Sequence, residues 1–197
     1  MGKLFYVIGK SSSGKDTIFQ SLLDNKELNL KPLVLYTTRP MRAGEKPGVQ
    51  YHFTDEAGLS RLEAEGKVIE LRAYHTIHGI WKYFTADTEA TDLERCNYIT
   101  VGVLESFRAV REYYGADRVV PLYIEVEDGE RLQRALDRER AQEEPRYAEM
   151  CRRFLADSED FSEEKIREAG IEKRFCNRDL KECLEEISSC ICALLKR

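Results

Sequence analysis

The chain has 197 residues, which suits one domain with a small insertion, and its 42% hydrophobic and 34% charged residues allow an ordinary core. The formal net charge of −5 argues against a general nucleic-acid binder, and no apolar run approaches the roughly 20 residues of a membrane span. The sequence shows no secretion signal, so we expect a cytoplasmic protein whose six cysteines are free thiols.

Short apolar runs alternate with amphipathic helical patterns along most of the chain. The expected strands are KLFYVI (3–8), LVLY (33–36), NYITVGV (97–103), RVVPLYIEV (118–126) and KRFC (173–176). The expected helices lie at 15–25, 104–114, 128–140, 150–161 and 179–195. Asp128 is the expected N-cap of the helix 128–140. This alternation predicts an α/β fold with a five-stranded parallel sheet flanked by helices.

Two segments interrupt the alternation. Residues 39–90 predict a small mixed α+β insertion, and the polar, proline-containing residues 139–149 predict a mobile lid. The core is then expected to consist of residues 1–38, 91–138 and 150–197.

The segment GKSSSGKDT (9–17) follows the first strand and opens a helix. Its glycines permit backbone angles that let successive N–H groups point inward and bind an anion at the helix N-terminus. Lys15 is placed to reach the β- and γ-phosphates of a nucleotide and is a predicted catalytic residue. The predicted ATP-binding residues of this loop are Gly9, Ser11, Ser12, Ser13, Gly14, Lys15, Asp16 and Thr17.

Asp16 stands where the phosphate-binding motif has serine or threonine, and Thr17 comes one position late. A carboxylate is a hard oxygen ligand, so Asp16 is a candidate ligand for Mg²⁺, directly or through water. The alternative is a negative charge that only stabilises the first turn of the helix.

The segment TTRPMRAGEKPGVQYHF (37–53) resembles the guanylate kinase family pattern T-T-R-x-x-R-x-G-E-x-x-G-x-x-Y-x-F. The resemblance implies that Arg39, Arg42 and Tyr51 bind the acceptor phosphate. Arginine suits this role because it stays charged and binds phosphate oxygens bidentately.

Further segments extend this resemblance over nearly the whole chain. VIELRAYHTIHG (68–79) is similar to the family strand whose glutamate binds the acceptor base, here Glu70, although an exposed strand carboxylate is the alternative. LQRALDRER and CRRFLAD resemble the family segments beside the lid, whose arginines act on the transferring phosphate. The best matches to these arginines are Arg138 and Arg153, and the next candidates are Arg134 and Arg152. CNRDL resembles a segment whose asparagine, here Asn177, lies near adenine.

The departures from the family pattern concern the acceptor base. Leu35 takes the place of a serine that meets guanine, and TVG (100–102) replaces the pattern D-x-D. HGIWKYFT (78–85) keeps His78 and loses an asparagine, and its acceptor-binding tyrosine is Tyr83 only with a shift of one residue. Removing polar groups relaxes discrimination between bases, so the departures leave the acceptor open.

The resemblance implies a phosphotransferase that converts ATP and GMP to ADP and GDP with Mg²⁺. Its expected partners are small-molecule nucleotides, with no nucleic acid and no membrane, and it is expected to be a monomer or a homodimer. One alternative is a related P-loop kinase for another phosphorylated acceptor, either a different nucleotide or a ribose bisphosphate. Another is a non-catalytic guanylate-kinase-like interaction domain, which the intact Gly9–Lys15 frame disfavours.

Overall fold

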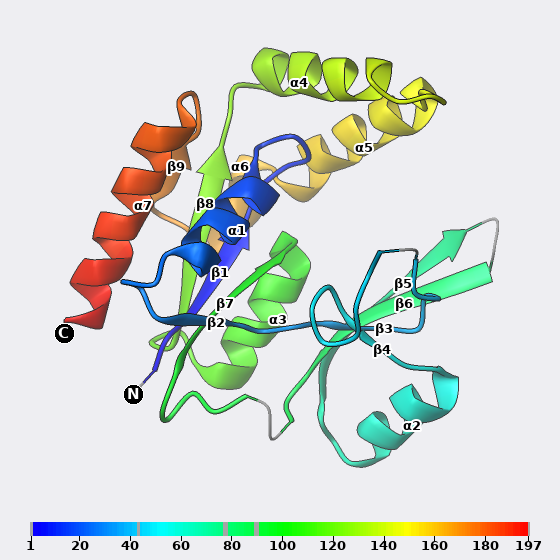
Figure 1. Cartoon of the computed structure of the whole chain (residues 1–197), viewed down its shortest axis with the longest axis vertical. Helices are drawn as coiled ribbons and strands as arrows, with labels where there is room; N and C mark the ends of the chain where they lie inside the picture. Colours follow the sequence, from blue (N-terminus) through cyan, green and yellow to red (C-terminus); the bar gives the residue numbers. More distant parts are fainter. Residues whose placement is uncertain (1, 43, 77–78, 89–90, 197) are drawn as a thin grey trace.

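The computed structural model describes residues 2–42, 44–76, 79–88 and 91–196. Its core is a sheet in the order β2-β7-β1-β8-β9, and each neighbouring pair of strands is parallel (Figure 1). The strands are β1 (Leu4–Ile8), β2 (Leu30–Pro32), β7 (Asn97–Gly102), β8 (Val119–Glu125) and β9 (Arg174–Cys176). The expected α/β fold with a five-stranded parallel sheet is confirmed.

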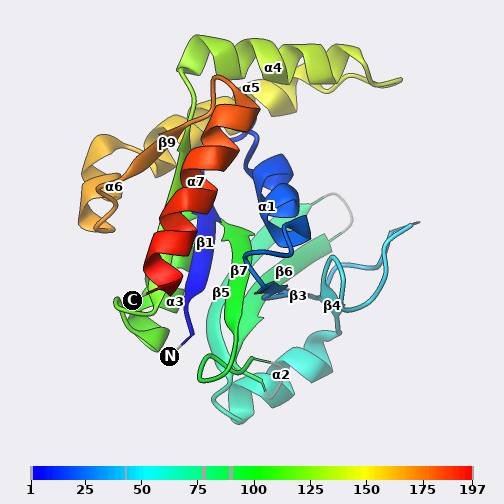
Figure 2. The same ribbon diagram turned by 60° about the vertical axis from the view of Figure 1, so that its left-hand side comes forward.

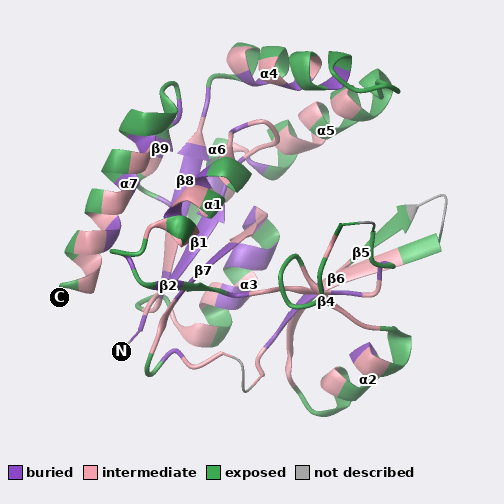
Figure 3. Ribbon diagram, in the orientation of Figure 1, coloured by how far each residue is buried: buried purple, intermediate pink, exposed green. Residues whose placement is uncertain are grey.

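Strand β1 lies in the middle of this sheet, and all its side chains are buried (Figure 3). Successive side chains of a strand point to opposite faces. One set packs against α3 (Leu104–Tyr114) and α6 (Glu163–Glu168), and the other packs against α1 (Lys15–Asp24) and α7 (Leu180–Leu195). The loop between β1 and α1 therefore leaves from the centre of a sheet that is covered on both faces.

A second, smaller sheet has the strand order β4-β3-β6-β5. Its elements are β3 (Tyr36–Thr37), β4 (His52–Phe53), β5 (Val68–Thr76), β6 (Gly79–Ala86) and the covering helix α2 (Glu56–Ala64). The pair β3–β4 is parallel, whereas β3–β6 and β5–β6 are antiparallel. The sheet is thus mixed, and a small cluster that includes Leu59 and Phe84 forms its own core.

Helices α4 (Asp128–Arg140) and α5 (Tyr147–Asp160) form an antiparallel hairpin beyond the carboxyl end of β8. This hairpin and the small sheet extend from the same side of the core (Figures 1 and 2). In the core sheet, β1 lies between β7, which follows the small sheet along the chain, and β8, which precedes the hairpin. The loop after β1 therefore begins between the two extensions. Within the described ranges, no helix combines the length and apolar composition that a membrane-spanning helix requires.

Two local predictions were wrong. The apolar run LVLY (33–36) is not one strand, because the chain there passes from one sheet to the other. Leu33 packs in the main core, and Tyr36 packs with the small sheet. The N-cap of α4 is Glu127 rather than Asp128, since the Glu127 carboxylate accepts a 3.0 Å bond from the Glu130 N–H.

Candidate active site

The loop between β1 and α1 has the geometry of an anion-binding nest. Ser12 and Gly14 have left-handed backbones, with φ of 63° and 84°. A Cβ at Gly14 would lie 2.4 Å from the Asn177 Nδ2, so only glycine fits this position. The buried hydroxyls of Ser12 and Ser13 have no hydrogen-bond partner among the described residues. Buried hydroxyls are ordinarily bonded, so these two suit the oxygens of a bound phosphate.

Lys15 begins α1 and is half-buried at the end of this loop. The pKa of its ammonium is lowered, chiefly because burial withdraws it from water. The positive charges of Arg138 and Arg153 lower this pKa further, whereas Asp16 and Asp157 raise it. The three predicted catalytic cations therefore lie close enough to influence one another.

Arg138 and Arg153 reach the loop from different helices of the hairpin. Both line one cavity with Ser11 and Ser12, and both side chains are exposed. Arg152 instead pairs with Glu149 on the exposed surface of α5, at 2.7 Å. Of the two neighbouring arginines of α5, Arg153 thus lies at the loop and Arg152 does not line its cavity.

The cation that holds the loop most closely was missed by the sequence interpretation. The Arg131 side chain is 1% exposed, and its Nη1 donates to the Ser11 carbonyl (2.9 Å) and to Asp157 Oδ2 (3.3 Å). The same carboxylate oxygen accepts the Ser11 N–H at 2.7 Å. The guanidinium also stacks 4.6 Å from the Phe154 ring centroid. Arg131 and Asp157 therefore fix the loop to both helices of the hairpin.

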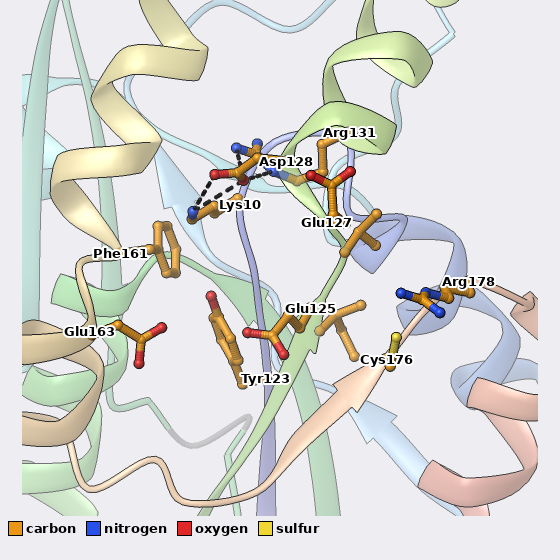
Figure 4. A pocket seen from close by; sticks show the side chains of 12 residues that line it. Lys10, Tyr123, Glu125, Glu127, Asp128, Arg131, Phe161, Glu163, Cys176 and Arg178 are labelled. Carbon is orange, nitrogen blue, oxygen red and sulfur yellow. Dashed lines mark hydrogen bonds and ion pairs between the residues drawn. The ribbon is translucent and has the colours of Figure 1, made fainter.

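Asp128 joins this group from the start of α4. Its carboxylate accepts from Arg131 Nε and Nη2, at 3.0 and 2.8 Å, and from Lys10 Nζ at 3.2 Å (Figure 4). Helical spacing puts Arg131, Ala135 and Arg138 on the face of α4 toward the loop, and all three line the same cavity. Spacing along α4 was thus the signal that could have identified Arg131.

Asn177 lies beneath the loop, where it is 4% exposed. Its Nδ2 donates to the Ser13 carbonyl at 2.8 Å, and its own N–H donates to the Glu125 carbonyl at 2.9 Å. Arg134 donates to the Asn177 carbonyl, also at 2.9 Å, and pairs with Glu130. Asn177 therefore connects the loop, β8 and α4.

On the small sheet, Arg39 forms the centre of a second cationic site. Its side chain is 3% exposed, and its two terminal nitrogens donate to the Glu45 carboxylate at 2.9 and 2.7 Å. Glu45 also accepts the Arg42 N–H at 2.7 Å. These contacts, the Arg39 guanidinium first, lower the pKa of Glu45 to about 2. Arg42 thus joins the site through its backbone, and its side chain is exposed.

Aromatic rings surround Arg39. Its guanidinium lies 5.4 Å from the Tyr51 ring centroid and 5.6 Å from that of Phe53. Tyr51 packs edge to face with Tyr83, at a centroid distance of 5.5 Å. Burial raises the pKa of Tyr51, so its hydroxyl stays protonated at neutral pH. The structure therefore brings Arg39, Tyr51 and Tyr83 together.

Glu70 is not an exposed strand carboxylate, since its side chain is only 7% exposed. It accepts from Arg72 Nε at 2.9 Å and from the Thr85 hydroxyl at 2.7 Å. The register of β5 and β6 places Glu70 opposite Thr85 and Arg72 opposite Tyr83. His78, from the same quoted segment, lies outside the described residues.

Comparison with known proteins agrees with this geometry. A family model described as "Guanylate kinase" matches residues 1–186. The chain belongs to the guanylate kinase family. A curated guanylate kinase of Porphyromonas gingivalis is 27% identical over the full length of both chains. Another, of Methylobacillus flagellatus, is 39% identical over 74 residues, which are 38% of this chain and 36% of that relative.

A solved structure supports the same fold. The crystal structure of guanylate kinase from Anaplasma phagocytophilum matches with a TM-score of 0.64 and 22% sequence identity. The match covers 98% of this chain and 85% of that chain. Family membership makes the protein an ATP-dependent nucleoside monophosphate kinase, and it does not favour the ribose bisphosphate or interaction-domain alternatives.

Proposed function

We propose that the protein transfers the γ-phosphoryl group of ATP to GMP, which yields ADP and GDP. The observation that carries this proposal is that a chain of the guanylate kinase family holds two separate clusters of cationic and hydrogen-bond-donating groups, each suited to a phosphate. One is the loop after β1, and the other is the Arg39 site of the small sheet. Transfer between two phosphates requires both to be held in line, and two such sites meet that requirement.

In this proposal the donor ATP binds the loop after β1. Its phosphates accept from the loop backbone, from the serine hydroxyls and from Lys15, and its adenine lies toward Asn177. The protein groups proposed to bind ATP are Gly9, Ser11, Ser12, Ser13, Gly14, Lys15, Asp16, Thr17 and Asn177. The buried hydroxyls of Ser12 and Ser13, which have no partner in the described ranges of the chain, support the assignment.

The acceptor is proposed to bind on the small sheet through Arg39, Arg42, Tyr51, Glu70 and Tyr83. A guanidinium has five N–H donors, and three Arg39 hydrogen bonds go to Glu45 and the Pro40 carbonyl. The buried Nε of Arg39 has no partner within the described part of the chain. Arg39 therefore retains donors for a phosphate while Glu45 holds it in place.

Between the two sites, Lys15, Arg138 and Arg153 are proposed to stabilise the charge that spreads over the transferring phosphoryl oxygens. Arg138 and Arg153 flank the proposed lid, residues 139–149, so closure of the lid would bring both cations in together. The same movement would exclude water, which otherwise takes the phosphoryl group. No side chain is required as a strong base.

We propose Mg²⁺ as the cofactor, with Asp16 as its protein ligand. The described residues contain no cluster of three or more His, Cys, Asp or Glu side chains that could hold a metal alone. A kinase magnesium site needs only one or two carboxylates beside the substrate phosphates, and the exposed Asp16 next to Lys15 fits that need. Bound there, Mg²⁺ would neutralise phosphate charge.

The acceptor can be identified by comparing kcat/KM for a set of phosphorylated compounds. Purified protein with ATP and Mg²⁺ is offered GMP, dGMP, IMP, AMP, CMP, UMP and ribose bisphosphate, and ADP release is followed. We expect GMP to give the highest kcat/KM. Faster turnover of ribose bisphosphate or of a nucleotide other than GMP or dGMP would contradict the proposal, and no turnover of any acceptor would favour an interaction domain.

We further propose that the protein acts in the cytoplasm on small nucleotides, as a monomer or homodimer. All six cysteines are free thiols, as expected in a reducing compartment. Cys183 is buried in α7, and burial raises the pKa of its thiol to about 11. It therefore belongs to the packing of the core.

A further inference from the structure

The polar groups that would read the acceptor base are few at the end of the core sheet. Leu35 offers no hydrogen bond from its side chain, and Gly102 has no side chain. Thr100 is 2% exposed, and its hydroxyl donates to the Leu33 carbonyl at 3.0 Å. These positions therefore contribute little to discrimination between acceptor bases. The groups that discriminate between bases must lie elsewhere in the protein.

Strand β5 presents two opposite charges side by side. Glu70 and Arg72 are two residues apart, so they project from the same face of the strand. Their side chains are 7% and 11% exposed, and two hydrogen bonds join them, at 2.9 and 3.3 Å. The Thr85 hydroxyl fixes the carboxylate from the other side. The two groups are thus held as one rigid unit.

This unit faces the acceptor site. Arg72 lies opposite Tyr83 in the β5–β6 register, and the Tyr83 ring packs against that of Tyr51 at a centroid distance of 5.5 Å. Burial raises the pKa of Tyr51, and the nearby charge of Arg72 opposes this rise. The charges of Glu70 and Arg72 also act on Tyr6, in the central strand of the core. The neighbouring Ile69 packs against the main core, so the pair lies beside the aromatic side chains around Arg39 and toward the core.

The chemistry of the pair matches guanine. Guanine presents two donors, N1–H and the N2 amino group, beside two acceptors, O6 and N7. A carboxylate accepts from the donors, and an arginine donates bidentately to O6 and N7. Adenine has an unprotonated N1 and a 6-amino group, so both of its edge groups would meet the wrong partner.

We propose that Arg72 is a specificity-determining residue, which donates to O6 and N7 of guanine while Glu70 accepts from N1–H and the N2 amino group. The inference rests on the proposed function and names a base contact that the phosphate sites do not supply. It restores the discrimination that Leu35 and the residues 100–102 lack. An Arg72 that only neutralised Glu70 would leave O6 and N7 unread.

The test compares Arg72→Met and Arg72→Lys with the wild type on GMP and on 7-deaza-GMP, which has a C–H in place of N7. Arg72→Lys keeps a positive charge beside Glu70 but cannot donate as a bidentate fork. Arg61→Met is the matched control, because Arg61 is an exposed arginine on α2 of the same extension. Circular dichroism and thermal melting verify that each variant is folded.

We expect Arg72→Met to raise KM for GMP about tenfold to a hundredfold, with KM for ATP unchanged. The wild type should prefer GMP to 7-deaza-GMP by about tenfold in kcat/KM, and Arg72→Met should lose this preference. Arg72→Lys should keep its fold and lose most of the preference. Arg61→Met should behave as the wild type in all of these measurements.

The inference would be overturned if Arg72→Met kept the preference for GMP over 7-deaza-GMP, or if its KM for GMP were unchanged. An equal loss on both substrates, with the preference intact, would show that Arg72 only positions Glu70. Failure of the wild type to phosphorylate GMP would contradict the proposed function itself, and this outcome is read from the wild type alone.

Discussion

At the scale of single residues, the two proposed phosphate sites are built from cations whose charge and orientation are influenced by neighbouring residues. Burial lowers the pKa of Lys15, yet the nearby Asp16 and Asp157 carboxylates oppose that shift. Glu45 holds Arg39 in place, and the Arg39 guanidinium in turn lowers the pKa of Glu45 and keeps it ionised. Lys15 is thus influenced by nearby carboxylates of the protein itself, and Arg39 is paired with one.

Replacing Asp16 with asparagine tests its proposed contact with Mg²⁺. The loss of a carboxylate ligand should raise the Mg²⁺ concentration for half-maximal activity by about tenfold. Asp24→Asn, at the other end of α1, is the control and should leave the Mg²⁺ requirement unchanged. An unaltered requirement in Asp16→Asn would assign Asp16 to the helix start alone.

Replacing Glu45 with glutamine should weaken the dependence of the free energy of unfolding on pH between about pH 5 and pH 2. The Glu45 pKa falls from an ordinary 4.5 to about 2 in the folded protein, so its ionised form stabilises the fold. That contribution is complete above about pH 5 and is lost as the pH falls toward 2. The wild type should therefore exceed Glu45→Gln in the free energy of unfolding near neutral pH, and the difference should shrink in acid.

Urea unfolding at a series of pH values measures this difference. Glu63→Gln, an exposed change on α2, should show no comparable pH-dependent loss. A difference between the wild type and Glu45→Gln that stayed constant into acid would mean that the Arg39–Glu45 pair does not hold the carboxylate ionised.

At the scale of elements, the α4–α5 hairpin is attached to the phosphate loop through buried charges. Arg131 on α4 and Asp157 on α5 both bond Ser11, one at its carbonyl and the other at its N–H. Arg138 and Arg153 lie farther along the same two helices, so the attachment at the base of the hairpin sets where both arginines stand. The position of the proposed catalytic arginines thus depends on Arg131 and Asp157.

Replacing Arg131 with methionine should therefore affect both stability and ATP binding. The Asp157 carboxylate would lose its buried partner, which typically costs about 3–5 kcal/mol. KM for ATP should rise, because the loop that would bind its phosphates loses its support. Urea unfolding and steady-state kinetics measure the two effects. The control is Arg140→Met, an exposed change at the end of α4 that should cost less than about 0.5 kcal/mol.

A double-mutant cycle with Asp157→Asn separates the ion pair from general packing. The double variant should be less destabilised than the sum of the two single variants, because each removes the same interaction. Additive losses, or an Arg131→Met that resembles Arg140→Met, would contradict the attachment of the hairpin to the loop.

Sequence patterns predicted the elements better than the contacts between them. Apolar runs and turn signals predicted β1, β7, β8 and β9 of the core sheet but not β2, because burial on both faces leaves long apolar runs and β2 is a short strand at Leu30–Pro32. LVLY (33–36) was misread because both sheets bury apolar residues, and a single run can cross from one to the other. Arg131 was missed because an arginine in a polar helix indicates a surface, and only the packing of α5 and the loop buries it.

At the scale of the whole molecule, the sequence named the residues proposed to bind phosphate, but of the two residues proposed to bind the base it named only Glu70 and not Arg72. The loop and the segment 37–53 are local motifs, so their residue types and spacing carry the chemistry directly. The Glu70–Arg72 unit depends on the β5–β6 register and on a facing core strand, which no local pattern contains. Glu45 stands within a recognised segment, yet its role follows from the fold of that loop around Arg39.

Phosphoryl transfer from ATP to GMP is tested most directly with ATP that carries ³²P in its γ-phosphate. With GMP and Mg²⁺ present, the account predicts that the label appears in the β-phosphate of GDP. Lys15→Met should lower the rate of this transfer by about a thousandfold or more, because a phosphate-binding cation is lost. Label found only in inorganic phosphate, or transfer that is unchanged in Lys15→Met, would contradict the account.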